Sequence, residues 1–518
     1  MRKFILAVFF TCLAPPLFCE PPPPKAPSPI SAEQKKEQLV ETEHKILTSK
    51  GVELKYTASC GTVILKDGKD EPQASIFYVA YRKRENKEPR PVTFCFNGGP
   101  GSSAIWLHLG IFGPKTIALD HEGEALFPYH LEENPYTLLE SSDLVFIDPV
   151  STGYSKALPG DTEKQFHGVD EDIKSVAEFI RIYVTRNNLW EVPKFIAGES
   201  YGTTRAAGLA EYLQTSERMY LNGIILISSI LDFQTIFLGQ ETNDLPFILA
   251  LPTYTAAAWY HKKIDPERKK ELLPLLKEAE AFASKDYALA LFSGDSLSAS
   301  DKESMAKQLS GYTGLSEDYL LRSNLRVSNL KFAKELLRQK NRSIGRFDAR
   351  FLGYEADSCK ETIENDPSLN QLLGAFASTF NYYIRNDLKW ISDASYNVIA
   401  DVTPWNFGKA INQYLNLGGS LRNAVYNNPL LHVFVASGYY DLATPYYATE
   451  YTFKHLGLNG ILKENVTMKT YDGGHMMYTD RRSLIALCQD LSTFFQKATR
   501  PNDKTSIKTP FQGESNER

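Results

Sequence analysis

The sequence predicts an α/β protein with a central, mostly parallel sheet, helices on both flanks and a mostly helical insertion. Short, continuously apolar runs, typical of strands buried on both faces of a parallel sheet, occur at 91–96 and 144–147, and another short strand is predicted at 194–197. Residues 169–187 and about 203–214 have helical spacing, so strands and helices alternate along the chain. A long stretch, 236–424, then shows helical patterns and almost no strand-like runs.

Residues 1–19 have the pattern of an export signal. Two basic residues follow the initiator, and an apolar run from Phe4 ends near Cys19. A pair of prolines interrupts this run, which is too short for a comfortable transmembrane helix. We therefore expect a cleaved signal peptide, no stable membrane span afterwards, and a secreted or periplasmic protein. An uncleaved anchor and a lipid on Cys19 are the alternatives.

The folded region is expected to begin at Gly51. Residues 20–50 hold a proline-rich run that cannot pack as helix or sheet, followed by a charged, helix-permissive segment that we place outside the core. Strand-like patterns follow at 61–65, 74–82 and 222–228. These strands and the apolar runs assign residues 51–235 to the sheet domain.

The insertion, 236–424, separates this part of the sheet domain from a second part, 425–499. Its helical patterns lie at 267–284, 301–309 and 329–338. Strand character returns at 430–436. The last residues, 500–518, are polar without apolar periodicity, and we expect a flexible tail.

Composition excludes several classes of protein. Apolar residues are 43% and charged residues 23% of the chain, as in soluble globular proteins. A net charge of -5 gives no basic footprint for nucleic acid. Neither a Cys-x-x-Cys nor a His-x-x-x-His cluster indicates a metal site, and we expect no cofactor. Outside the signal, one disulfide is possible among Cys60, Cys95, Cys359 and Cys488.

Residues 198–202, Gly-Glu-Ser-Tyr-Gly, follow a predicted strand and open a predicted helix. This is the context of the nucleophile elbow of α/β hydrolases, in which a tight turn holds a serine exposed above the strand ends. Glycine on both sides leaves room for the turn, and the helix N-terminus favours negative charge beside the serine. The motif predicts Ser200 as the nucleophile of an α/β hydrolase.

A glycine-rich loop, Asn-Gly-Gly-Pro-Gly-Ser-Ser at 97–103, directly follows the strand ending at Phe96. In α/β hydrolases this loop supplies one backbone N–H to the oxyanion hole, and the residue after the nucleophile supplies the other. We therefore expect the amides of Gly99 and Tyr201 to stabilise an oxyanion. A phosphate-binding loop is disfavoured, because the Gly-x-x-x-x-Gly-Lys-Ser pattern is absent.

The histidine and its carboxylate partner should follow the serine in the order Ser, Asp or Glu, His. His475 lies in Tyr-Asp-Gly-Gly-His, whose glycines allow a close approach to the serine. Asp441 comes just past the strand 430–436, where the carboxylate that orients the histidine belongs. The rival Asp472 is expected to shape the histidine loop. The remaining histidines after the serine, for which we expect structural roles, are His261, His432 and His455.

The sequence resembles the serine carboxypeptidases, peptidase family S10, over about residues 50–235 and 430–495. The resemblance rests on four motifs in order: 97–103, Asp-Pro-Val-Ser-Thr-Gly-Tyr-Ser at 148–155, 198–202 and Gly-Gly-His-Met at 473–476. It implies metal-free cleavage of single residues from peptide C-termini, with Ser200, Asp441 and His475 as the triad. It also implies that Asn97, Gly98 and Glu199 bind the substrate's terminal carboxylate.

Two departures from the family pattern concern that carboxylate site. The family pairs its Glu before the nucleophile with a second Glu, and Ile111 stands at the matching position here; a family tryptophan is matched by Cys95. Without a second carboxyl group, we expect Glu199 to ionise near neutral pH and to repel a substrate carboxylate.

Three functions remain open. The leading hypothesis is an exported serine-type carboxypeptidase acting on peptides. An esterase, amidase or acyltransferase would use the same acyl-enzyme with another substrate, and the loss of a carboxyl group at Ile111 favours this alternative. A catalytically inactive binding protein is disfavoured by the intact serine, aspartate, histidine and glycine loops. The expected partner is a peptide or acyl substrate, and the sequence indicates no oligomeric state.

Overall fold

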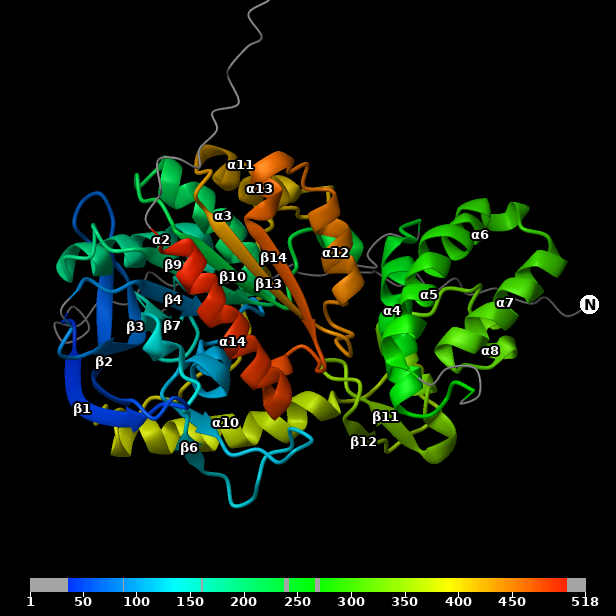
Figure 1. The fold of residues 1–518 in the computed structure, drawn as a ribbon, viewed down its shortest axis with the longest axis horizontal. Coiled ribbons are helices and arrows are strands. Elements are labelled where there is room, and N and C mark those ends of the chain that lie inside the picture. The colour runs from blue at the N-terminus through cyan, green and yellow to red at the C-terminus, as the bar shows by residue number, and fades with distance from the viewer. Residues whose placement is uncertain (1–35, 87, 160–161, 237–241, 266–270, 501–518) are drawn as a thin grey trace, which may run out of the picture.

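A computed structural model describes residues 36–86, 88–159, 162–236, 242–265 and 271–500 (Figure 1). The predicted export signal, 1–19, and nearly all of the predicted tail lie outside these residues. Within the described ranges, every helix is too short or too polar to cross a membrane.

The core is a ten-stranded sheet, and its order is β1-β2-β3-β7-β4-β9-β10-β13-β14, with β8 paired to β3. The strands are β1 (Leu39–Leu47), β2 (Glu53–Lys66), β3 (Pro72–Lys83), β4 (Val92–Phe96), β7 (Asp143–Ile147), β8 (Lys156–Ala157), β9 (Lys194–Glu199), β10 (Gly223–Ile227), β13 (His432–Gly438) and β14 (Val466–Tyr471). The six neighbouring strands β7, β4, β9, β10, β13 and β14 run parallel to one another. Strands β1, β2 and β3 pair antiparallel, as do β3 and β7. The predicted mostly parallel sheet is confirmed.

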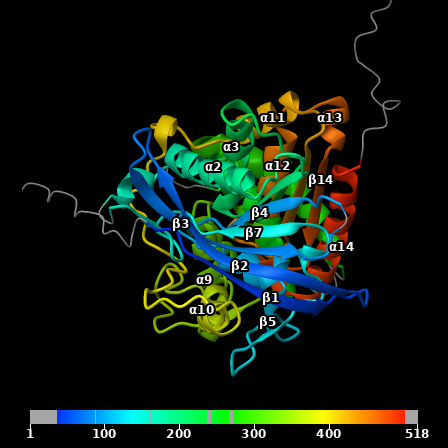
Figure 2. The same ribbon diagram turned by 90° about the vertical axis from the view of Figure 1, so that its left-hand side faces the viewer.

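Helices cover both faces of the sheet (Figures 1 and 2). One face packs against α2 (Val169–Arg186), α3 (Tyr201–Thr215) and α11 (Gly418–Asn427), whose apolar residues share one core cluster with the strands. The opposite face packs against the short α1 (Ile105–Leu107), α10 (Pro367–Asn386) and α14 (Arg481–Ala498) in a second cluster. The central parallel strands β4, β7, β9 and β10 are therefore buried on both sides, which explains their mostly apolar sequences.

The strand β1 corrects the prediction for residues 36–50, the described part of the predicted linker, whose proline-rich run lies outside the described residues. The charged segment expected to be helix-permissive and outside the core forms β1, whose nine residues pair with β2 from Leu39 opposite Gly61 to Leu47 opposite Glu53. Its charged residues lie on an edge strand, where one side of the backbone stays in solvent. The sheet therefore begins before Gly51.

The segment 236–424 is mostly helical. Its helices are α4 (Leu245–Tyr260), α5 (Leu272–Phe282), α6 (Ala288–Ser293), α7 (Ala299–Thr313), α8 (Glu317–Arg322), α9 (Asn329–Glu335) and α10. Helices α4 to α8 form a lobe beside the sheet (Figure 1), and their apolar side chains share a third cluster with α9 and with residues that follow β13. The chain returns from this lobe through the hairpin of β11 (Arg342–Ile344) and β12 (Leu352–Tyr354) to α10.

Candidate active site

The predicted site residues follow the carboxyl ends of neighbouring parallel strands. Asn97 follows β4, Ser200 follows β9, Asp441 follows β13 and His475 follows β14. Carboxyl ends of parallel strands meet at one edge of a sheet, where ligands bind in open α/β folds. A cavity of about 460 Å³ lies there, lined by Asn97, Ser200 and His475.

Ser200 occupies a strained turn between β9 and α3. Its φ of 59° and ψ of -130° lie in a backbone region that residues with a side chain rarely adopt. A Cβ at Gly198 would overlap the carbonyl of Gly202, and one at Gly202 would lie 2.9 Å from the carbonyl oxygen of Phe96. The glycines therefore permit the turn that projects Ser200 into the cavity.

His475 and Asp441 are joined directly. The Nδ1 of His475 lies 2.8 Å from Oδ2 of Asp441, and both side chains are buried. Asp441 also accepts hydrogen bonds from the amides of Ala443 and Thr444 and from the Thr444 hydroxyl. Burial opposes its ionisation, but His475 and these donors outweigh burial and lower the pKa of Asp441.

The backbone and the ring of His475 are each held by a further contact. The backbone carbonyl accepts a hydrogen bond from the Ser228 hydroxyl at 2.6 Å, and the centroid of the Phe347 ring lies 4.8 Å from that of the imidazole. Burial alone would lower the pKa of His475, but Asp441 and then Glu199 raise it above its ordinary value. The imidazole thus lines the same cavity as Ser200, with its Nδ1 bonded to Asp441.

The rival Asp472 does not contact His475 in this way. Its backbone carbonyl accepts hydrogen bonds from Ser483 and Arg350, so it fixes the loop before His475. The three other histidines after Ser200 lie outside the cavity lining; His261, for instance, bonds the carbonyl of Ala349.

The glycine loop packs directly on the nucleophile turn. A Cβ at Gly98 would overlap the backbone nitrogen of Tyr201 and lie 2.6 Å from that of Gly202. Gly99 has a φ of 100°, a backbone conformation that favours glycine. The amide-bearing residues Gly99 and Tyr201 both line the cavity with Ser200. This is the arrangement that the predicted oxyanion hole needs.

Glu199 is buried at the cavity wall and accepts a hydrogen bond at each carboxylate oxygen. Its Oε1 accepts a hydrogen bond from Nδ2 of Asn97 at 2.9 Å, and its Oε2 accepts one from the Tyr478 hydroxyl at 2.6 Å. Burial raises the pKa of Glu199 to about 7, although His475, Tyr478 and Asn97 oppose this rise. Glu199 therefore titrates near neutral pH, and burial takes the place of a second carboxyl group in raising its pKa.

Several cavity residues carry no signal in the sequence. Trp106, Phe233, Arg346, Phe347, Leu369 and Ile399 line the cavity. Four of these six come from the segment 236–424, whose local patterns indicate helices and loops but not what they face. Thr444 lies three residues after Asp441, and its amide and hydroxyl both donate to that carboxylate. Aspartate side chains often accept hydrogen bonds from the backbone a few residues on, and this spacing is the signal that could have identified Thr444.

No metal cluster or disulfide is found in the described part of the chain. The described His, Cys, Asp and Glu side chains form no group of three or more able to hold a metal ion. Cys60, Cys95, Cys359 and Cys488 are all unpaired, and Cys95 is fully buried in the core.

The family model described as serine carboxypeptidase matches residues 64–489, which include every cavity residue named above. Curated relatives match over shorter stretches. The pheromone-processing carboxypeptidase KEX1 of Cryptococcus gattii is 30% identical over 138 residues, 26% of this chain and 19% of that protein. The vitellogenic carboxypeptidase of Aedes aegypti is 27% identical over 132 residues, 25% of this chain and 26% of that protein. The chain thus matches about a fifth to a quarter of the length of these two relatives.

Among solved structures, the chain is similar to KEX1(delta)p, a prohormone-processing carboxypeptidase from Saccharomyces cerevisiae. The TM-score is 0.55 at 17% sequence identity, and the match covers 85% of this chain and 91% of that chain. At this identity the likeness concerns the fold. It agrees with the predicted α/β-hydrolase architecture of a mostly parallel sheet flanked by helices.

Proposed function

We propose, because this chain belongs to the serine carboxypeptidase family, that it is a serine-type carboxypeptidase that releases the last residue of peptides through an acyl-enzyme on Ser200. The observation that carries the proposal is that residues suited to acyl transfer and residues suited to binding a terminal carboxylate line the same cavity. Ser200 and His475, with Asp441 behind the histidine, provide acyl transfer. Asn97 and Glu199 provide a hydrogen-bonded pair for a terminal carboxylate.

The proposed chemistry uses side chains and backbone amides. Ser200 Oγ attacks the acyl carbon of the last peptide bond while Nε2 of His475 takes the hydroxyl proton. Asp441 holds Nδ1–H and stabilises the imidazolium that forms. The amides of Gly99 and Tyr201 stabilise the oxyanion. His475 then protonates the leaving amine, and water attacks the acyl-enzyme with His475 again as the base.

The carboxylate site would select substrates with a free C-terminus. Asn97 Nδ2 carries two hydrogens, of which one is donated to Glu199 and the other is available to a carboxylate. Protonated Glu199 adds a second donor, whereas ionised Glu199 repels the substrate. Gly98, between Asn97 and Gly99, lets the backbone of this loop lie against the nucleophile turn.

We also propose export. The basic start and apolar run of residues 1–19 support a cleaved signal peptide, and a secreted or periplasmic location follows from it. N-terminal sequencing of the protein recovered from its native host should give a mature chain that begins near Glu20. A mature chain that still begins at Met1 would contradict cleavage.

The test uses N-blocked dipeptides that differ only in having a free or an amidated C-terminus. The wild type should release the last residue from the free-carboxylate substrates, and Ser200→Ala should release none. A fluorophosphonate probe should label the wild type and not Ser200→Ala. Labelling of neither protein would indicate the inactive binding protein.

The alternative of an esterase, amidase or acyltransferase is favoured by Ile111 alone, since a second carboxyl group is missing from the carboxylate site. Equal cleavage of free and amidated termini by the wild type would support that alternative and overturn the carboxypeptidase.

A further inference from the structure

Tyr478 reaches Glu199 from the core side of the cavity wall. Its hydroxyl donates to Oε2 of Glu199 at 2.6 Å, and both side chains are almost entirely buried. Glu199 lines the cavity, but Tyr478 is not among the lining residues. A substrate in the cavity would therefore meet Tyr478 only through Glu199.

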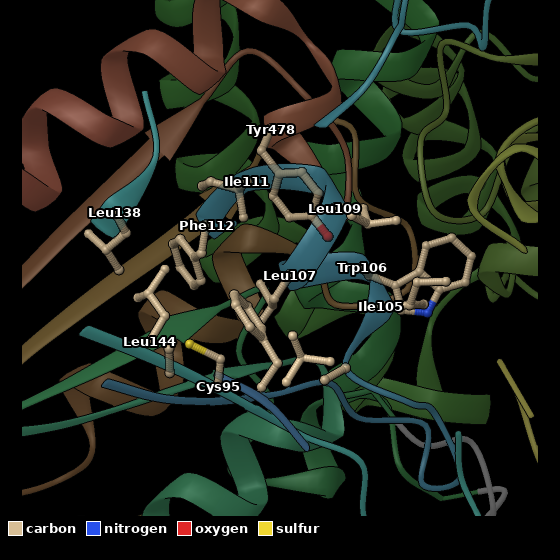
Figure 3. Close-up of a cluster of buried hydrophobic side chains, with 14 of the residues drawn as sticks. Cys95, Ile105, Trp106, Leu107, Leu109, Ile111, Phe112, Leu138, Leu144 and Tyr478 are labelled. Atoms are coloured by element: carbon tan, nitrogen blue, oxygen red, sulfur yellow. The ribbon is translucent and has the colours of Figure 1, made fainter. Parts of the chain in front are cut away.

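The ring of Tyr478 lies in an apolar pocket of the core. Figure 3 shows it beside Ile111 and Leu109, and these residues belong to one buried cluster. A Cβ at Gly110 would overlap the Tyr478 ring, so glycine at this position makes room for it. The carboxylate of Glu199 is the acceptor recorded for the Tyr478 hydroxyl among the described residues. The phenol proton therefore points to Oε2.

The two oxygens of Glu199 are consequently not equivalent. Oε2 faces Tyr478 in the core, whereas Oε1 lies against Asn97, which lines the cavity. Asn97 itself is fixed, because its Oδ1 accepts the amide hydrogen of Leu107 at 3.1 Å. Its Nδ2 must then be the atom that donates to Oε1. The Tyr478 bond, at 2.6 Å, is shorter than the Asn97 bond, at 2.9 Å, so it lowers the basicity of Oε2 more, and a proton binds preferentially at Oε1.

We propose that Tyr478 is a positioning residue that directs the acid proton of Glu199 to Oε1 and sets the pH range in which the cavity accepts a carboxylate. This inference rests on the proposed function. The phenol differs in effect from a second carboxyl group, because its hydrogen bond favours the ionised form of Glu199.

The phenol differs from a carboxyl group in keeping its proton. Burial and the neighbouring Glu199 hold the pKa of Tyr478 well above 10, so it remains a donor at every pH at which the enzyme would work. The charged groups that act on Glu199 are His475, which favours its ionisation, and Asp441, which opposes it. Because Tyr478 donates to the ionised form, it lowers the pKa that burial has raised.

The readout is the ratio of kcat/KM for a free-carboxylate dipeptide to kcat/KM for its amide, measured from pH 5 to 9. Titration of His475 affects both substrates and cancels in the ratio. In the wild type the ratio should fall as pH rises, with a midpoint near 7, since ionised Glu199 repels only the carboxylate.

In Tyr478→Phe the carboxylate of Glu199 loses a donor, so its pKa rises. The midpoint of the ratio should move upward by about one to two pH units, the size expected for one hydrogen bond to a buried charge. Tyr471→Phe is the matched control, because it removes a phenol–carboxylate bond to Asp490, and its midpoint should stay at the wild-type value. Unequal effects on the two substrates distinguish this role from a packing role.

Two further variants sharpen the test. Glu199→Gln should give a ratio independent of pH, and adding Tyr478→Phe to it should leave the ratio flat. Should Tyr478→Phe fail to fold, 3,5-difluorotyrosine at position 478 keeps the shape but is a stronger donor, and should move the midpoint downward. A midpoint that stays at the wild-type value in Tyr478→Phe, or in the difluorotyrosine variant, overturns the role of Tyr478 but leaves the proposed function standing. A wild type that cleaves acid and amide equally at every pH overturns the proposed function, and the inference with it.

Discussion

At the scale of single residues, the Asp441 side chain is completely buried and accepts four hydrogen bonds. Its two oxygens accept from two backbone amides, the Thr444 hydroxyl and Nδ1–H of His475. A buried carboxylate with this many donors is held ionised and cannot turn. It therefore fixes both the tautomer and the direction of the imidazole.

Replacing Asp441 by Asn should leave the fold intact and lower kcat by about 10⁴-fold. The amide would present a donor to Nδ1 and so favour the tautomer whose Nε2–H cannot accept a proton from Ser200. Steady-state hydrolysis of one free-carboxylate dipeptide measures the effect. Asp472→Asn is the matched control, since that residue serves its loop through its backbone carbonyl, and kcat should change less than about tenfold. A larger loss of kcat with Asp472→Asn than with Asp441→Asn would instead identify Asp472 as the partner of His475.

Sequence patterns reveal residues that a turn requires, but not residues that a core brings together. Ser200 was predictable because a tight turn needs glycine at 198 and 202, and the loop at 97–103 for a similar reason. Tyr478 reaches Glu199 only through tertiary packing over Gly110, which no local pattern reports. The burial that raises the pKa of Glu199 has no local signature for the same reason.

At the scale of elements, a buried ion pair joins α2 and α3 to the glycine loop. Nε of Arg205 on α3 lies 2.8 Å from Oδ2 of Asp172 on α2, with both side chains less than 5% exposed. A second nitrogen of Arg205 donates to the backbone carbonyl of Asn97 at 2.6 Å. The guanidinium also lies 5.3 Å from the Phe96 ring and 5.5 Å from the Tyr201 ring. Arg205 thus ties the nucleophile helix to the loop after β4.

Arg205→Met should lower the free energy of unfolding by about 3–5 kcal/mol, because it leaves Asp172 buried without its partner. Urea unfolding followed by circular dichroism measures the loss. The exposed pair Lys45–Glu53 provides a control, and Lys45→Met should cost less than about 1 kcal/mol. Adding Asp172→Leu to Arg205→Met should restore part of the loss. Equal effects at Arg205 and Lys45 would contradict a structural role for the buried pair.

Central and edge strands differ in how far their sequences predict them. The central strands β4, β7 and β9 are continuously apolar because helices cover both of their faces. The edge strands β1 and β14 carry polar and charged residues and bury few side chains, so β1 was mistaken for a helix-permissive linker. Edge strands owe their structure to a neighbour far along the chain, which local patterns cannot show.

At the scale of the whole molecule, Asp148 connects the sheet with the insertion. Its Oδ1 accepts from the amide of Ala104 at 2.9 Å and from the Tyr396 hydroxyl at 3.1 Å. Its Oδ2 is also buried. Burial raises the pKa of Asp148 to about 7, against the opposition of these donors. The folded protein therefore binds this proton more tightly than the unfolded chain does.

The stabilising effect of the Asp148 proton should disappear as pH rises. Between the ordinary pKa of 3.8 and about 7, the folded state holds more protons than the unfolded state, so the contribution falls across this window. Relative to Asp148→Asn, which stays neutral, the wild type should lose on the order of 4 kcal/mol between pH 4 and pH 8. Urea titrations at several pH values measure the difference. Parallel curves for the two proteins, as expected for the exposed Asp318→Asn, would contradict this account.

The cavity draws its walls and its reactive groups from different parts of the chain. Ser200, Asp441 and His475 follow strands of the sheet, whereas Arg346, Phe347, Leu369 and Ile399 come from the insertion. Substrate preference is therefore free to diverge during evolution while the hydrolytic apparatus is inherited unchanged. Laboratory selection for new residue specificity should accordingly randomise positions 346, 347, 369 and 399 first. Variants from such a library would retain the machinery for acyl transfer and differ in the peptides they accept.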